Sequence, residues 1–173
     1  MDRYVIMVDA GYLLRQSIEI ISQRTSTARG DLTVTNPAGL IDLLLEKSKN
    51  TLCLSSKELL RIYWYDGVMA TGLTGQQRSI MKLPDLHFRA GTVNKAGAQK
   101  GVDSLITTDL IELATNHAIC DALLVTGDGD LAIAIEGSSQ RHRRTVLKNI
   151  ATCALRTRSL LSMENFSAHK PAH

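Results

Sequence analysis

Four aspartates stand where apolar runs of this chain give way to turns or helices. Asp9 ends the run RYVIMVD, Asp103 follows Lys-Gly-Val at the start of a helical pattern, and Asp128 and Asp130 follow the run DALLVTG. If the apolar runs are parallel strands, these carboxylates lie at one edge of the sheet, where the strands' carboxyl ends meet. Carboxylates about 4 Å apart repel by roughly 4 kcal/mol at an effective dielectric near 20, so the cluster needs cations. We therefore predict a divalent-metal site at this edge.

The ligand types indicate which metal this would be. No His or Cys stands in these motifs, and oxygen ligands alone favour Mg²⁺ or Mn²⁺ over zinc. Each motif by itself has a simpler explanation, because Gly-Asp-Gly-Asp is common in turns and Asp103 would cap its helix. Asp9 is harder to explain, since a carboxylate that follows a buried strand needs a partner. The occurrence of all these motifs in one chain favours the metal.

Other polar residues near these motifs are interpreted as structural. Asp66 stands in Asp-Gly, an ordinary turn dipeptide that follows an apolar run. Asp109 lies six residues beyond Asp103, about 240° around a helix, so we do not expect it to share the same metal. His87 and His117 have no ligand spacing and are expected to be structural.

Strand-like and helix-like runs alternate along the chain. Buried β-branched runs bounded by Asp, Gly or Pro predict strands at residues 4–8, 59–65, 86–93 and 122–125. Helical spacing predicts helices at residues 13–21, 37–49, 76–83 and 102–117 and one that begins at 131. Residues 24–36 are expected to form an exposed loop, residues 145–150 a weak fifth strand, and residues from about 162 on no order. This alternation predicts an α/β fold, a Rossmann-like three-layer sandwich with a mainly parallel sheet.

Composition bounds the class of protein. With 173 residues, 44% of them hydrophobic, the chain is long enough for one domain with a single core. It has no apolar run long enough for a membrane span and no secretory signal, so we expect a cytoplasmic protein that does not enter a membrane. The three cysteines contain no C-x-x-C pair and are expected to be reduced. The sequence is compatible with a homodimer.

Charge is unevenly divided along the chain. Residues 1–136 contain 13 Lys and Arg against 16 Asp and Glu, whereas residues 137–173 contain 7 against 1. A basic segment beside an acidic edge suits a polyanionic substrate, although basic tails are also commonly just solvated. The candidate phosphate contacts are Lys95, Lys100, Arg141, Arg143 and Arg144.

Four segments, in this order and spacing, resemble a known family. VDAGYLL, YWYDG, KGVDSLITTDLIEL and LLVTGDGDLAIAI are similar to motifs of the NYN domains in the PIN-like nuclease superfamily, especially the bacterial LabA-like branch. The resemblance covers residues 3 to about 136, which gives a nuclease domain at residues 1–136 followed by an atypical, partly disordered basic segment at 137–173. It implies a PIN-like fold and a metal held by Asp9, Asp103, Asp128 and Asp130. One departure is Tyr12, which stands where many relatives have Asn.

The resemblance implies a metal-dependent ribonuclease, a hydrolase that cleaves RNA phosphodiester bonds with Mg²⁺ or Mn²⁺. The partner is then RNA, single-stranded or structured. A second hypothesis is an RNA- or protein-binding regulatory module that keeps the acidic cleft without useful turnover, which Tyr12 would favour. A haloacid-dehalogenase-like phosphatase fits less well, because it needs Asp-x-Asp and Gly11 occupies the second Asp position.

Overall fold

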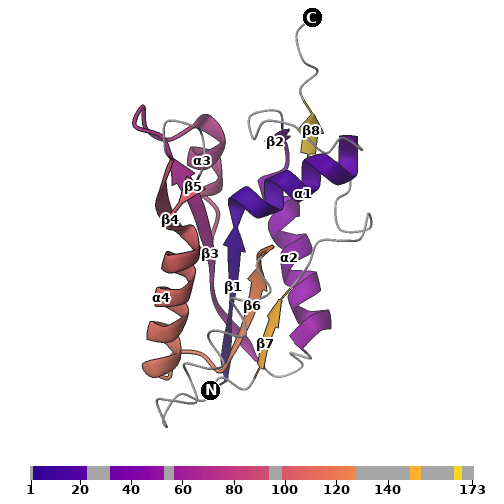
Figure 1. The fold of residues 1–173 in the computed structure, drawn as a ribbon. Helices are drawn as coiled ribbons and strands as arrows, with labels where there is room; N and C mark the ends of the chain where they lie inside the picture. The colour runs from indigo at the N-terminus through magenta and orange to yellow at the C-terminus, as the bar shows by residue number, and fades with distance from the viewer. Residues whose placement is uncertain are drawn as a thin grey trace, which may run out of the picture.

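The fold alternates strands and helices along the chain. The computed structural model describes residues 2–22, 32–52, 57–93, 99–127, 149–152 and 166–168. Within these ranges the elements are β1 (Arg3–Asp9), α1 (Ala10–Ser22), β2 (Leu32–Val34), α2 (Pro37–Leu52), β3 (Glu58–Val68), α3 (Gly75–Ile80), β4 (Leu86–Val93), β5 (Gln99–Lys100), α4 (Val102–Thr115), β6 (Asp121–Val125), β7 (Asn149–Thr152) and β8 (Phe166–Ala168). Figure 1 shows them as a ribbon.

A mainly parallel sheet forms the middle of the molecule. Its strand order is β5-β4-β3-β1-β6-β7. The pairs β4–β3, β3–β1, β1–β6 and β6–β7 are parallel, and the short edge strand β5 is antiparallel to β4. β2 and β8 form a separate antiparallel pair. The chain fills the sheet on one side of β1 and then crosses to β6 on the other side.

Helices cover both faces of this sheet (Figure 1). Alternate side chains of β1 explain the three layers, because successive residues of a strand point to opposite faces. Tyr4, Ile6 and Val8 pack into a core cluster with apolar side chains of α1, α2 and α3. Val5 and Met7 pack into a second cluster with apolar side chains of α4. Burial on both faces explains why β1 is an unbroken apolar run.

The predicted α/β architecture is confirmed, and three local expectations are wrong. The run that ends at Tyr65 continues as a strand to Val68, so Asp66 lies inside β3 rather than in a turn. Within the expected loop at residues 24–36, Leu32–Val34 forms β2. Phe166–Ala168, expected to be disordered, forms β8 against it. Lys100 lies in β5, which the sequence did not predict.

Two expectations near the C-terminus have different outcomes. The weak strand expected at residues 145–150 is observed as β7 at Asn149–Thr152, beside β6. The helix expected from residue 131 lies outside the described residues.

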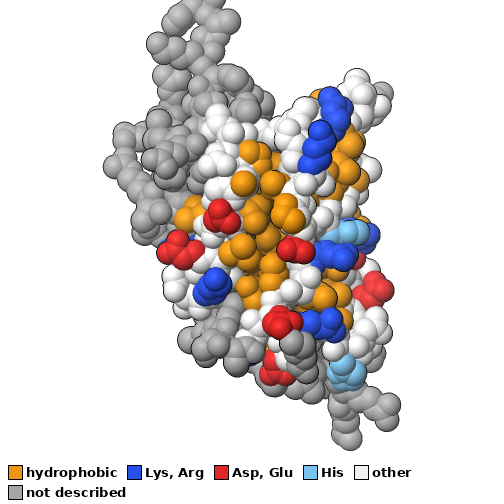
Figure 2. Space-filling view, turned by 180° about the vertical axis from the view of Figure 1, so that it is seen from behind, with side chains coloured by type: hydrophobic (Ala, Val, Ile, Leu, Met, Phe, Trp, Pro, Cys, Tyr) orange, Lys and Arg blue, Asp and Glu red, His pale blue; other side chains and the backbone are white. Residues whose placement is uncertain are grey.

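The surface carries a broad area of hydrophobic side chains on the face shown in Figure 2, bordered by acidic and basic side chains. Among the described residues, the large hydrophobic side chains that are most exposed are those of Met69, Met81 and Ile111. An apolar area of this kind is compatible with a contact surface, and the homodimer stays a prediction. None of the described helices is both long and apolar enough to span a membrane.

Candidate metal centre

Asp9 is the last residue of the central strand β1. Its Cα is in register with that of Tyr65 in β3, and the alternation along β1 places it on the face that α4 covers. The Oδ1 atom of Asp9 accepts a hydrogen bond from the backbone N–H of Tyr12 at 3.2 Å. Asp9 therefore ends the strand and also caps the first turn of α1. This capping contact fixes one oxygen of the candidate metal ligand.

Asp103 stands in the first turn of α4, and its side chain is exposed. Gly101 precedes the helix with φ of 80°, a left-handed conformation that glycine adopts without strain. The N-cap residue Gly101 makes no side-chain capping hydrogen bond, and the negative charge of Asp103 in the first turn is favourable at the positive end of the helix dipole. Because α4 leads into β6, which is parallel to β1, its N-terminus lies at the carboxyl edge of the sheet.

The order of the strands defines where a ligand binds. The chain leaves β1 toward β3 and β4 and later returns to β6 on the other side, so the strand order reverses between β1 and β6. Ligands of open α/β sheets bind beyond the carboxyl ends of the strands at such a point. Asp9 ends β1 at this point, and Asp103 begins α4 at the same edge. The structure therefore brings the first two predicted aspartates to one edge.

The other predicted ligands, Asp128 and Asp130, lie outside the described residues, although they follow β6 closely in sequence. In the described ranges no group of three or more His, Cys, Asp or Glu side chains is close enough together to hold a metal ion. The donor set still fits a hard divalent cation, because Asp9 and Asp103 offer carboxylate oxygens only. The two described aspartates are thus part of a proposed ligand set.

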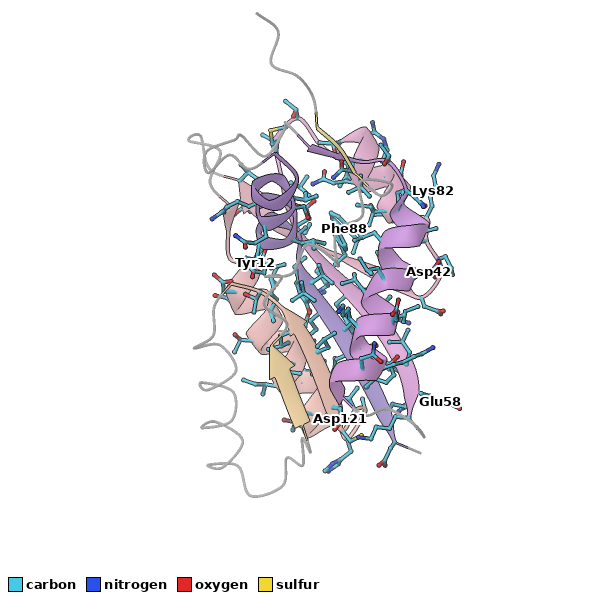
Figure 3. The ribbon with its side chains drawn as sticks, turned by 90° about the vertical axis from the view of Figure 1, so that its right-hand side faces the viewer. Tyr12, Asp42, Glu58, Lys82, Phe88 and Asp121 are labelled. Atoms are coloured by element: carbon cyan, nitrogen blue, oxygen red, sulfur yellow. The ribbon has the colours of Figure 1, made fainter. Side chains whose placement is uncertain are left out.

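Tyr12 in the first turn of α1 and Gly127, which follows β6, are in contact beside the same topological switch point. A Cβ atom at Gly127 would lie 2.7 Å from Cδ2 and 2.8 Å from Cε2 of Tyr12, so the ring lies directly on the glycine. Figure 3 shows Tyr12 near the carboxyl end of β6, whereas Asp121 marks the opposite end of this strand. The sequence suggested only that Tyr12 removes a polar group. The contact itself has no sequence signal, because it joins residues 115 positions apart.

Asp66 is a buried residue inside β3, not the turn residue that the sequence predicts. It is 2% exposed, and its Oδ2 atom accepts a hydrogen bond from Nε2 of Gln77 at 2.9 Å. Gln77 belongs to α3, and it also donates to the backbone carbonyl of Gly67 at 3.0 Å. Asp66 therefore joins β3 to α3, on the opposite face of the sheet from Asp9 by strand alternation.

Asp109 is buried in a hydrogen-bonded network. Its Oδ2 atom accepts hydrogen bonds from the Tyr65 hydroxyl at 2.9 Å and from Nε of Arg89 at 2.8 Å, and its Oδ1 atom accepts from Nη2 of Arg89 at 2.7 Å. Burial, with the negative charge of Asp109, raises the pKa of Tyr65, and the hydrogen bond to Asp109 raises the pKa of Arg89. These contacts join α4 to β3 and β4, and the absence of Asp109 from the metal site stays a prediction.

The two histidines show no arrangement for metal binding. His87 contacts the ring of Tyr63 edge-on, with ring centroids 5.4 Å apart, and burial lowers the pKa of His87. His117 follows the end of α4 with a positive φ of 54°. Their assignment as structural residues stays a prediction.

Most of the predicted phosphate contacts lie outside the described residues. Lys100 lies in β5, opposite Thr92 of β4, and leads directly into α4. Lys95, Arg141, Arg143 and Arg144 lie outside the described residues.

A mainly parallel sheet with two aspartates at its topological switch point is the arrangement expected of a PIN-like α/β domain. The family model described as "NYN domain" matches residues 34–160, and the chain belongs to this family. The match includes Asp103 and continues into the basic C-terminal segment.

One curated relative is itself uncharacterized. It is the "Uncharacterized protein y4oD" of Sinorhizobium fredii (strain NBRC 101917 / NGR234), 44% identical over 64 residues. The aligned part is 37% of this chain and 30% of that protein. No solved structure matches the chain.

Proposed function

We propose that this protein is a Mg²⁺- or Mn²⁺-dependent ribonuclease that cleaves RNA phosphodiester bonds at the carboxyl edge of its sheet. The observation that supports this best is the common location of Asp9 and Asp103. One ends the central strand and the other begins α4, at the edge where the strand order reverses. The NYN family membership supports the same reaction class.

In this proposal Asp9 and Asp103 hold the metal, together with Asp128 and Asp130. A bound Mg²⁺ or Mn²⁺ supplies a water of lowered pKa and neutralises charge on the phosphate. Asp9 is suited to a fixed ligand position because the Tyr12 N–H orients one of its oxygens. Asp103 is exposed and so is open to solvent and to a long polyanion.

The basic residues provide binding rather than chemistry in this proposal. Lys100 ends β5, three residues before Asp103 in the first turn of α4. Lys95 and the three arginines of the C-terminal segment are proposed to contact phosphates elsewhere along the RNA.

Turnover of a labelled single-stranded RNA tests this function. We expect cleavage by the purified protein with Mn²⁺, its loss when EDTA is added, and its return when Mn²⁺ is restored in excess. Cleavage that persists unchanged in EDTA would exclude a dissociable metal as the source of activity.

The second candidate is a regulatory module that binds RNA or protein without useful turnover. Tyr12 favours it, because this tyrosine, whose ring packs on Gly127, stands where many relatives have the polar side chain of Asn. RNA binding by gel shift together with no cleavage in Mn²⁺ or Mg²⁺ would support this alternative over the nuclease.

A further inference from the structure

Three residues form a row across the sheet beside the candidate metal centre. The Cα of Asp9 in β1 is in register with that of Tyr65 in β3, which is in register with that of Arg89 in β4. Since these strands are parallel and in register, the three side chains share one face. Tyr65 packs into the cluster formed with α4, so this is the face that α4 covers.

Asp109 attaches α4 to this row. Its carboxylate accepts three hydrogen bonds, one from Tyr65 and two from the guanidinium of Arg89, at 2.7 to 2.9 Å. The Asp109 side chain is 7% exposed and that of Arg89 is 36% exposed. A bidentate, charge-assisted pair of this kind has strict geometric requirements. Rotation of α4 would break all three bonds and leave a buried carboxylate without compensation.

The apolar contacts of α4 with the sheet are less specific. Val102, Ile106 and Leu110 pack into one apolar cluster with side chains of β1, β3 and β6, and such packing is non-directional. The Asp109 network therefore sets the rotation and the height of α4 on the sheet. Asp103 lies six residues earlier on the same helix, about 9 Å along its axis. The position of Asp103 relative to Asp9 thus depends on Asp109.

We propose that Asp109, held by Tyr65 and Arg89, is a positioning residue that orients α4 so that Asp103 and Asp9 bind one metal ion. The metal part of this inference rests on the proposed function. The network itself stands on the described contacts. Its partners belong to β3 and β4, so metal affinity would depend on strands that contribute no described ligand.

The chain offers a matched control at the other end of the sheet. Asp121 is 0% exposed and pairs with Lys57, so it is also a buried carboxylate with a cationic partner. It begins β6, far from the carboxyl edge, as Figure 3 shows. Asp109→Asn and Asp121→Asn each remove one buried charge, and only the first disturbs the orientation of α4.

The first measurement is backbone hydrogen exchange in metal-free protein. Leu105 donates to the carbonyl of Gly101 in the first turn of α4, and its amide reports local opening there. Each variant is measured at the same number of degrees below its own melting temperature. We expect Asp109→Asn to speed amide exchange at Leu105 and Ile106 more than Asp121→Asn does. Equal exchange at these amides in the two variants would overturn the proposal.

The second measurement is Mn²⁺ affinity by electron paramagnetic resonance. Asp109→Asn should weaken it about 10-fold or more, as loss of residues that orient metal ligands does, and Asp121→Asn should leave it within about 2-fold. Tyr65→Phe removes a single hydrogen bond to Asp109 and should weaken Mn²⁺ affinity less than Asp109→Asn does. It replaces Asp109→Asn in the test if that variant does not fold. Equal weakening in the Asp109 and Asp121 variants contradicts the positioning role. A wild type that binds no Mn²⁺ refutes the proposed function, while the exchange result still decides whether the network orients α4.

Discussion

The ring of Tyr12 lies on Gly127, with ring carbons 2.7 and 2.8 Å from the place where a Cβ of residue 127 would be. The contact joins the first turn of α1 to the segment that follows β6. The backbone N–H of the same tyrosine donates to Asp9. Tyr12 therefore contacts both sides of the topological switch point, through its backbone on one side and its ring on the other.

Gly127→Ala should be destabilising because the added methyl group overlaps the Tyr12 ring. Overpacking of this kind typically costs about 1 to 3 kcal/mol of unfolding free energy, which urea denaturation measures. In a Tyr12→Ala background the ring is absent, so the same alanine should cost much less. An equal cost in both backgrounds would show that the contact with Tyr12 is not the reason why alanine is unfavourable at position 127.

Asp103→Asn should reduce metal-dependent RNA turnover by more than about 100-fold, since changes to groups that merely orient metal ligands already cost 10- to 100-fold. The melting temperature should change little, because the side chain is exposed. Asp42→Asn is the matched control, an exposed carboxylate in α2. Full turnover in Asp103→Asn would remove this residue from the site.

The alkaline stability of the protein should depend on Tyr65. Burial raises the pKa of Tyr65, so its contribution to stability is present below the ordinary tyrosine pKa near 10 and is lost as pH rises above it. Tyr65→Phe should be less stable at pH 7 by about 1 to 2 kcal/mol, since Asp109 loses one hydrogen bond. Above pH 10 the difference in unfolding free energy between the wild type and Tyr65→Phe should narrow by up to about 1.4 kcal/mol per pH unit. A gap that stays constant in urea melts from pH 7 to 11 would contradict this.

Replacing Arg141, Arg143 and Arg144 with Gln should weaken RNA binding without changing the rate at saturating RNA. Each phosphate contact to a single strand contributes about −0.7 to the slope of log affinity against log salt, so the slope should flatten by about 2. Fluorescence anisotropy at several salt concentrations measures it. An unchanged slope would shift phosphate binding to Lys95, Lys100 and their neighbours.

Much of the fold could be predicted from local patterns. β4 was predicted at residues 86–93 and is observed as Leu86–Val93, because Pro84 and the polar residues around it bound an apolar run clearly. For β3 the sequence predicts an end at Tyr65, because Asp-Gly usually turns the chain, whereas the strand continues to Val68. Here Gln77 of α3 donates to Oδ2 of the buried Asp66, and a partner 11 residues away is not visible in the local pattern.

The site was predictable in part. The positions of Asp9 and Asp103 at one edge follow from the strand order that alternating elements imply. The partners of Asp109 could not be foreseen, since Tyr65 and Arg89 come from two other strands. For Tyr12 the sequence indicates only that it stands where many relatives have Asn, whereas in the structure its ring packs on Gly127, which is distant in sequence.

The most direct test of the metal centre is a crystal structure of the protein soaked in Mn²⁺, with anomalous scattering used to locate the ion. We expect a manganese peak within coordination distance of carboxylate oxygens of both Asp9 and Asp103, which the Asp103→Asn crystal lacks or shows weakly. Crystals soaked at a concentration that supports full turnover, with no manganese at either carboxylate, would contradict the proposed site.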